Sequence, residues 1–159
     1  MIGRARIVEA DVNSHRMIVI WDGHEVMNFP ASYGLSSDPR RNTTNGIQVV
    51  MSKSQKVLMS NPAYGYYVNI PEYWAVRISN NGEFIHANPE TTGVQGSSNV
   101  THGCVNLSTA NAREYFNTAM FGDPVEVTGS STPLTGADGD IYDWTVSWES
   151  WLAMSALRS

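Results

Sequence analysis

The dipeptide Asp22-Gly23 constrains this sequence most, because it separates two β-prone segments, residues 15–21 and 24–29. A two-residue turn between antiparallel strands needs positive φ at its central residues, and Asp-Gly accepts that conformation readily. The sequence therefore predicts a β-hairpin over these two segments. Asn80-Asn81-Gly82 has the same character and predicts a second tight turn.

Further β-prone segments follow the hairpin, and each is bounded by Asn, Gly, Pro or Ser. These segments are residues 46–51, 55–60, 74–79, 83–86 and 125–128. Many short strands separated by turn residues are typical of an all-β sandwich or barrel. We therefore expect a mainly β fold in which most strands are antiparallel.

One helix is expected within this β-structure, over residues 110–121. Ser108 can cap its N-terminus, and Gly122 can end it. Its apolar residues recur at helical spacing, so this face should pack against a sheet. These residues are Ala112, Tyr115, Phe116 and Ala119.

The C-terminal region begins with a linker rich in Gly, Ser, Thr and Pro, residues 129–139. Three tryptophans then recur at i, i+4 and i+7: Trp144, Trp148 and Trp151. This spacing predicts a helical extension whose indole rings pack against the rest of the protein. We therefore expect a single domain over residues 1–128, with the linker and extension of residues 129–159 packed on it.

Composition excludes several classes of protein. Hydrophobic residues make up 42% of the 159 residues and charged residues 16%, values typical of a folded domain. The formal net charge of -5 offers no basic surface, so we expect no nucleic-acid partner. The chain has no apolar run of about 18 residues and no apolar signal core after Met1. We therefore expect either a cytosolic protein or a mature or trimmed piece of an exported one, with membrane contact only through an N-terminal segment outside this sequence, if there is any.

Cys104 is the only cysteine, so it cannot form an internal disulfide and must serve packing or chemistry. It lies in residues 99–106, which read NVTHGCVN. A thiolate nucleophile needs a base or an imidazolium nearby, and both His102 and the strand-end residue His86 are candidates. Gly103 allows a sharp turn that would lift the sulfur out of the strand and expose two backbone N–H groups to an oxyanion. The residues alone therefore favour an activated thiol and leave the base undecided.

The segment around Cys104 admits two other interpretations. A buried structural cysteine would need neither the glycine nor the polar frame of Thr101 and Asn106, which can hold the loop in shape. A zinc site built from His86, His102 and Cys104 lacks an obvious fourth ligand, and no second cysteine supports it. We therefore expect neither a metal nor another cofactor.

His86, the spacer 87–100 and Thr101-His102-Gly103-Cys104-Val105-Asn106 together resemble the signature of L,D-transpeptidase catalytic domains. The resemblance continues through residues 29–34, 43–46 and 122–127. The Trp-rich tail is similar to the C-terminal extension of mycobacterial members. The resemblance implies an L,D-transpeptidase-like β-sandwich with one internal α-helix and a C-terminal Trp-rich helical extension.

The resemblance also implies an enzyme that cross-links bacterial peptidoglycan outside the cytoplasmic membrane. Cys104 would attack the carbonyl that joins the L-centre of a diamino acid to D-alanine in a tetrapeptide stem. D-Alanine would leave, and a thioester would form. The side-chain amine of a neighbouring stem peptide would then resolve the thioester. β-Lactams of the carbapenem class would be covalent inhibitors.

Roles for individual residues follow from the same resemblance. His86 would be the base partner of Cys104, with its ring oriented by the backbone carbonyl of Ala87. His102 would lie on the rim of the site or support the loop. Tyr73, on a lid, would contribute to the oxyanion site. The other residues expected to line or support the substrate site are Met59, Tyr64, Thr101 and Asn106.

Two further functions remain open at this point. Water rather than an amine could resolve the thioester, which would make the chain an L,D-carboxypeptidase or another hydrolase acting on stem peptides. A catalytically silent wall-binding module is the other alternative. The intact set of residues around Cys104 argues against a silent module.

Overall fold

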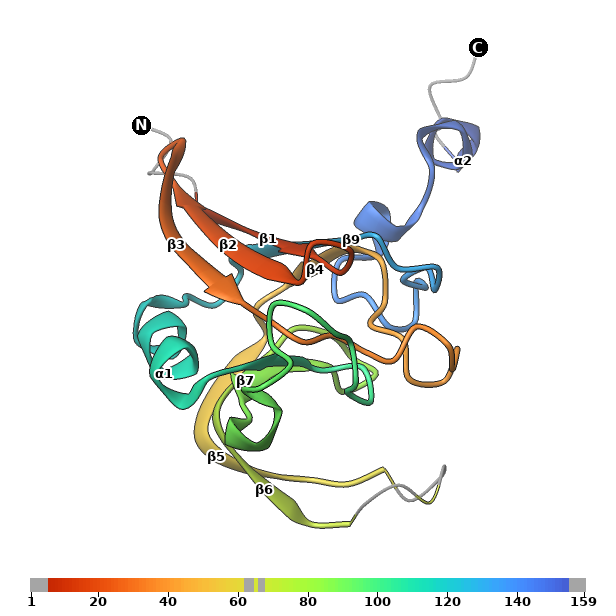
Figure 1. The fold of residues 1–159 in the computed structure, drawn as a ribbon. Coiled ribbons are helices and arrows are strands. Elements are labelled where there is room, and N and C mark those ends of the chain that lie inside the picture. Colours follow the sequence, from red (N-terminus) through yellow and green to blue (C-terminus); the bar gives the residue numbers. More distant parts are fainter. Residues whose placement is uncertain (1–5, 62–64, 66–67, 155–159) are drawn as a thin grey trace.

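A computed structural model describes residues 6–61, 65 and 68–154 (Figure 1). Two β-sheets face each other, and helix α1, Thr109–Thr118, closes one side of the sandwich between them. The mainly β fold with one internal helix, expected from the sequence, is confirmed. No helix within these described ranges is both long enough and apolar enough to cross a membrane.

The first sheet has five strands in the order β3-β2-β1-β9-β4. Its strands are β1 (Arg6–Asp11), β2 (Arg16–Trp21), β3 (His24–Pro30), β4 (Gly46–Val49) and β9 (Pro124–Thr128). The predicted hairpin is β2–β3, and its turn residues Asp22 and Gly23 both have positive φ, 54° and 80°. β9 lies between β1 and β4, parallel to the first and antiparallel to the second.

The second sheet has four strands in the order β5-β6-β7-β8. Its strands are β5 (Ser52–Met59), β6 (Ile70–Arg77), β7 (Phe84–Ala87) and β8 (Val105–Leu107). β7 and β8 are parallel, whereas the other neighbours are antiparallel. The five segments predicted after the hairpin correspond to β4 to β7 and to β9, with shifted ends. β8 was not predicted, because three residues are too few to show a period.

The core lies between the two sheets and α1. Its fully buried side chains come from both sheets and include Val8, Met17, Val19, Val76, Ile85, Val105, Leu107 and Val125. Ala112 and Tyr115 of α1 are buried on β6 and β7, as the helical spacing predicted. Phe116 packs edge-on against Trp74 of β6, with 5.4 Å between ring centroids.

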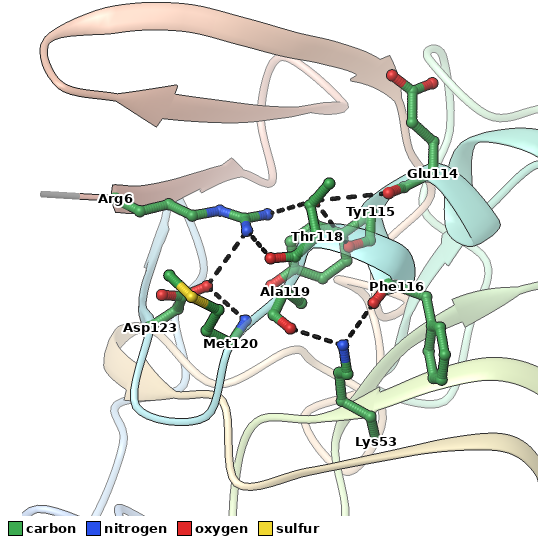
Figure 2. Close-up of polar contacts among 9 residues, drawn as sticks. All are labelled: Arg6, Lys53, Glu114, Tyr115, Phe116, Thr118, Ala119, Met120 and Asp123. Atoms are coloured by element: carbon green, nitrogen blue, oxygen red, sulfur yellow. Dashed lines mark hydrogen bonds and ion pairs between the residues drawn. The ribbon is translucent and has the colours of Figure 1, made fainter. Parts of the chain in front are cut away.

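Helix α1 ends earlier than expected, at Thr118 rather than at residue 121. Figure 2 shows that basic side chains from the two sheets contact the last carbonyl groups of this helix. Lys53 Nζ of β5 donates to the Phe116 and Ala119 carbonyls at 2.7 Å each. Arg6 of β1 donates to the Thr118 carbonyl and, at 2.8 Å, to its hydroxyl. These cations satisfy carbonyls that have no partner inside the helix and favour the negative end of its dipole.

The C-terminal extension contains two short helices, η3 (Tyr142–Thr145) and α2 (Trp148–Met154). The predicted packing of its tryptophan stripe is wrong for Trp144 and Trp148, which are 44% and 65% exposed. The two residues lie in separate helices, so they do not share one helical face, and α2 projects away from both sheets in Figure 1. The side chain of Trp151 is outside the described part of the structure.

The linker that precedes this extension does contact the first sheet. Asn45, next to β4, accepts a hydrogen bond from the Leu134 N–H and donates one to the Thr132 carbonyl. Leu134 is also buried. The division of the chain at residue 128 stays a prediction.

Lys53→Met should destabilise the protein, because it removes both hydrogen bonds to the helix end and keeps the apolar stem of the side chain. We expect the free energy of unfolding to fall by about 1–2 kcal/mol in urea titrations. Lys56→Met is the matched control, since Lys56 lies on the same strand and reaches the exposed ring of Tyr73. Equal losses in the two variants would contradict a specific role for Lys53.

Candidate active site

One face of the four-stranded sheet packs into the core, and the opposite face carries the candidate site. Successive side chains of a strand point to opposite faces. Ile85 and Ala87 of β7 and Val105 and Leu107 of β8 belong to the core. His86 therefore points to the other face, where the parallel register sets it opposite Asn106.

A short loop, residues 101–104, presents Cys104 beside this face. Gly103 has φ of +117°, a conformation that side chains rarely adopt, so the predicted sharp turn is present. The Thr101 hydroxyl donates to the Cys104 carbonyl at 2.7 Å and accepts from the Gly103 N–H at 3.2 Å. Thr101 therefore ties both sides of the turn together.

The 34–43 segment supports the loop from outside. The Thr43 hydroxyl donates to the Gly103 carbonyl at 2.8 Å and accepts from the Gly34 N–H at 2.9 Å. A Cβ atom on Gly34 would lie 1.9 Å from the Arg41 carbonyl oxygen, so only glycine fits there. Arg41 in turn donates to the Thr101 carbonyl at 3.1 Å. The position of Cys104 thus depends on a segment about 60 residues earlier in the chain.

His86 is almost completely buried, and its Nδ1 has two acceptors within hydrogen-bonding distance. Nδ1 lies 2.9 Å from the Ala87 carbonyl oxygen and 3.1 Å from Oε2 of Glu72. Because a carbonyl and a carboxylate only accept hydrogen bonds, Nδ1 carries a proton. Nε2 is the nitrogen left for the hydrogen bond between His86 and Cys104. Burial disfavours the charged ring, but the hydrogen bonds to Cys104 and Glu72 outweigh it and raise the pKa of His86 to about 10.

His102 lies in a different environment. It is half-buried, and burial together with the positive charge of Arg41 lowers the pKa of its ring. It lines both cavities beside Cys104. The role of His102 at the rim of the site stays a prediction.

Two cavities meet at Cys104. The first is lined by most of the residues proposed from the sequence: Met59, His86, Thr101, His102, Cys104 and Asn106. The second shares Met59, His102 and Cys104 and adds the charged side chains of Arg40, Arg77 and Glu83. The sulfur can therefore be approached from two sides, which suits a reaction with two substrates.

Tyr73 does not reach Cys104. It pairs with Ala87 across β6 and β7, so it points to the face opposite His86, and it is 47% exposed. It lines a separate hollow with Pro71 and Trp74. Its neighbour Glu72 occupies the expected side of the strand instead. Tyr64 lies outside the described residues.

Asn106 and Gly103 differ in detail from what the sequence suggested. The Asn106 side chain makes only a long contact with Thr91, 3.5 Å, and its buried Oδ1 has no hydrogen-bond partner among the described residues. The loop is held by Thr101 and Thr43, not by Asn106. The Gly103 N–H is directed to Thr101, which leaves the Cys104 N–H as the candidate oxyanion donor.

Glu83 is a buried carboxyl that sequence reasoning missed. It accepts from the Thr44 N–H at 2.8 Å, from the Thr44 hydroxyl at 2.5 Å and from Gln48 at 3.1 Å. Burial outweighs these hydrogen bonds and raises the pKa of Glu83 to about 7. Neither Glu83 nor Glu72 has a sequence signal, because each stands next to residues of ordinary strand character. The described part of the chain contains no group of three or more His, Cys, Asp or Glu placed to hold a metal ion.

Residues 5–127 match the sequence model of the L,D-transpeptidase catalytic domain (YkuD). Over 98% of its length the chain is 59% identical to L,D-transpeptidase 5 of Mycobacterium tuberculosis, and it spans 34% of that protein. It is 37% identical, again over 98% of its length, to L,D-transpeptidase 2 of the same species, of which it spans 39%. The chain thus corresponds to little more than a third of the length of these curated relatives.

Solved structures agree with the sequence match. The structure of the LD transpeptidase LdtMt1 in complex with imipenem superposes with a TM-score of 0.73 at 35% identity, over 79% of this chain and 60% of that chain. L,D-transpeptidase 3 from Mycobacterium tuberculosis, in complex with a faropenem-derived adduct, gives 0.71 at 31% identity, over 80% and 61%. The described fold is therefore that of these proteins.

Glu83 should make stability depend on pH. Its pKa is raised from 4.5 in the ordinary case to about 7, so the folded protein binds this proton more tightly than the unfolded chain. The free energy of unfolding should therefore fall as pH rises through this window, by about 1–3 kcal/mol. Glu83→Gln should flatten this slope in urea titrations, whereas Glu9→Gln, at an exposed position on β1, should keep it.

The raised pKa of His86 does not obscure this test at acidic pH. Its contribution to stability is fully present below its ordinary value of 6.5 and is lost only as pH rises toward about 10. Measurements between pH 4.5 and 6.5 therefore report Glu83 with the His86 contribution constant. An identical slope in the native protein and in Glu83→Gln would refute the assignment.

Proposed function

The chain belongs to the L,D-transpeptidase catalytic-domain family, and from this membership we propose that it cross-links peptidoglycan stem peptides through a thioester on Cys104. The observation that carries the proposal is that Cys104 and His86 line one cavity together and that Cys104 also lines a second cavity. A nucleophile, its base partner and two approaches to the sulfur are what a two-substrate acyl transfer needs.

The first half-reaction forms the thioester. His86 Nε2 takes the proton of Cys104, and the thiolate attacks the carbonyl between the L-centre of the diamino acid and D-alanine. The C–N bond breaks, the leaving amine takes the proton from His86, and D-alanine departs. The Cys104 N–H donates to the oxyanion as it forms. Asn106 Oδ1, which is buried and has no hydrogen-bond partner within the described part of the chain, accepts an N–H group of the donor stem.

The second half-reaction transfers the acyl group to an amine. The side-chain amine of another stem enters the cavity that the donor does not occupy and attacks the thioester carbonyl. His86 takes the proton of the amine, the C–S bond breaks as the new C–N bond forms, and the departing sulfur takes the proton from His86 to restore the thiol. Met59 and His102 line both cavities and so contact both peptides. Because peptidoglycan is the substrate, we propose an extracytoplasmic location.

Product analysis tests the reaction itself. With a tetrapeptide stem and an amine acceptor we expect a cross-linked dimer and free D-alanine, detected by mass spectrometry. Cys104→Ala should reduce dimer formation by at least about a thousandfold, because no other thiol is present. A tripeptide without dimer would identify a hydrolase instead. Activity that persists in Cys104→Ala would refute the cysteine mechanism.

Acylation by a carbapenem tests the roles of the two histidines. The structures of two similar proteins contain imipenem and a faropenem-derived adduct, so we expect a stable carbapenem adduct on Cys104 in intact-mass spectra. His86→Gln should slow acylation about 100-fold or more, since the base is lost. His102→Gln should cause a clearly smaller loss. The reverse order would assign the base to His102.

A further inference from the structure

Glu72 is a carboxylate at the centre of the site for which the proposed reaction has no role. Its Oε2 lies 3.1 Å from Nδ1 of His86, the ring nitrogen that does not face Cys104. The Glu72 side chain is 18% exposed and the His86 side chain 4%, so the contact is largely shielded from water. The Glu72 carboxylate therefore lies next to the ring nitrogen of His86 that is farther from the nucleophile.

The fold directs Glu72 toward His86. Tyr73 on β6 pairs with Ala87 on β7, so their side chains lie on one face of the sheet. Because side chains alternate along a strand, the preceding residues Glu72 and His86 both lie on the other face. A bulge follows at once, with Trp74 and Ala75 opposite His86. Trp74 has φ of +53° there, which a bulky residue adopts only when its surroundings impose it. Bulges of this kind re-aim side chains next to active sites.

We propose that Glu72 is a positioning residue that completes a Cys104–His86–Glu72 triad. The inference rests on the proposed nucleophilic role of Cys104. The carboxylate touches no reacting atom and acts only through His86. It keeps the proton on Nδ1, holds Nε2 toward the sulfur, and balances the charge that His86 acquires. One proton moves from Cys104 Sγ to His86 Nε2, which leaves a thiolate beside an imidazolium.

A carboxylate supplies what the Ala87 carbonyl cannot. The carbonyl orients the ring but carries no net charge. A full negative charge at 3.1 Å, in a place that water reaches poorly, interacts with the imidazolium more strongly than it would in bulk solvent. Burial is the largest influence on the pKa of His86 and lowers it, and Cys104 and Glu72 are the two groups that raise it. The other charged or titratable side chains that line the cavities at Cys104 are His102, Glu83, Arg40 and Arg77.

Glu72 also lines the first cavity, so a second role must be distinguished: binding the cationic amine of an acceptor peptide. The two roles differ in the free enzyme. A carboxylate that acts through His86 changes the reactivity of Cys104 without any substrate. A carboxylate that only binds an amine changes the KM for the acceptor and leaves the free thiol unaltered.

Alkylation by iodoacetamide measures that reactivity directly, because Cys104 is the only thiol. Rates are measured as a function of pH for the native protein and three variants, Glu72→Gln, Glu72→Asp and Glu90→Gln. In Glu72→Gln we expect the midpoint of the profile to move to higher pH and the rate at neutral pH to fall about tenfold. Glu72→Asp keeps the charge and should recover most of the rate. Glu90, exposed on the turn after β7, provides the matched control.

An unshifted profile in Glu72→Gln would overturn the triad. If the acceptor KM of the same variant were raised, Glu72 would be assigned to amine binding instead. Because alkylation needs no peptidoglycan, the shift can appear even if cross-linking is never observed, so the two proposals fail separately. Nitrogen-15 spectra of the native protein add a test without mutation: Nδ1 of His86 should stay protonated at every pH, and a bare Nδ1 would refute the triad.

Discussion

The parallel pairing of β7 with β8 is the constraint on which the candidate site depends. It sets His86 opposite Asn106, and the alternation of the strands then brings Cys104 to the same face. Ile85 precedes His86 in β7, and Val105 precedes Asn106 in β8. Both apolar side chains are fully buried in the core. A slip of one residue would turn these apolar side chains to solvent and bury the histidine, so the hydrophobic core itself fixes the register of the nucleophile and its base.

Sequence reasoning reached the features that depend on local chemistry or on fixed spacing. The β2–β3 hairpin followed from Asp22-Gly23, and the candidate nucleophile from a single cysteine beside Gly103. It failed where a single residue decides the face of a strand: Tyr73 was expected at the site, but Glu72 is there. The bulge at Trp74 that accompanies this choice has no signature in the sequence. The tryptophan stripe failed for another reason, because η3 and α2 are separate helices and a helical period has no meaning across the break.

Buried polar contacts between distant segments stabilise the irregular parts of the fold. Arg6 joins β1 to the end of α1, Thr43 joins an early loop to Gly103, and Glu83 joins the start of β7 to the residues around β4. Each of these groups costs free energy to bury and is tolerated because its partners are present. The chain has a single cysteine and therefore no internal disulfide, so its folded structure depends on these contacts and on the hydrophobic core. The loop of Cys104 is likewise held by hydrogen bonds from hydroxyl groups on both sides.

The central place of β9 in the five-stranded sheet has a consequence for how the protein folds. β1 and β4 are separated in space until β9 inserts between them, although β9 is the last strand of the sandwich to be synthesised. During synthesis, both strands therefore expose an unpaired edge until residue 128 has left the ribosome. Assembly from contacts so far apart in the sequence is slow and cooperative, since loop closure precedes any gain from pairing. Truncation before β9 would leave a three-stranded sheet, β3-β2-β1, and the single strand β4, each with an open edge that is prone to pair with another chain.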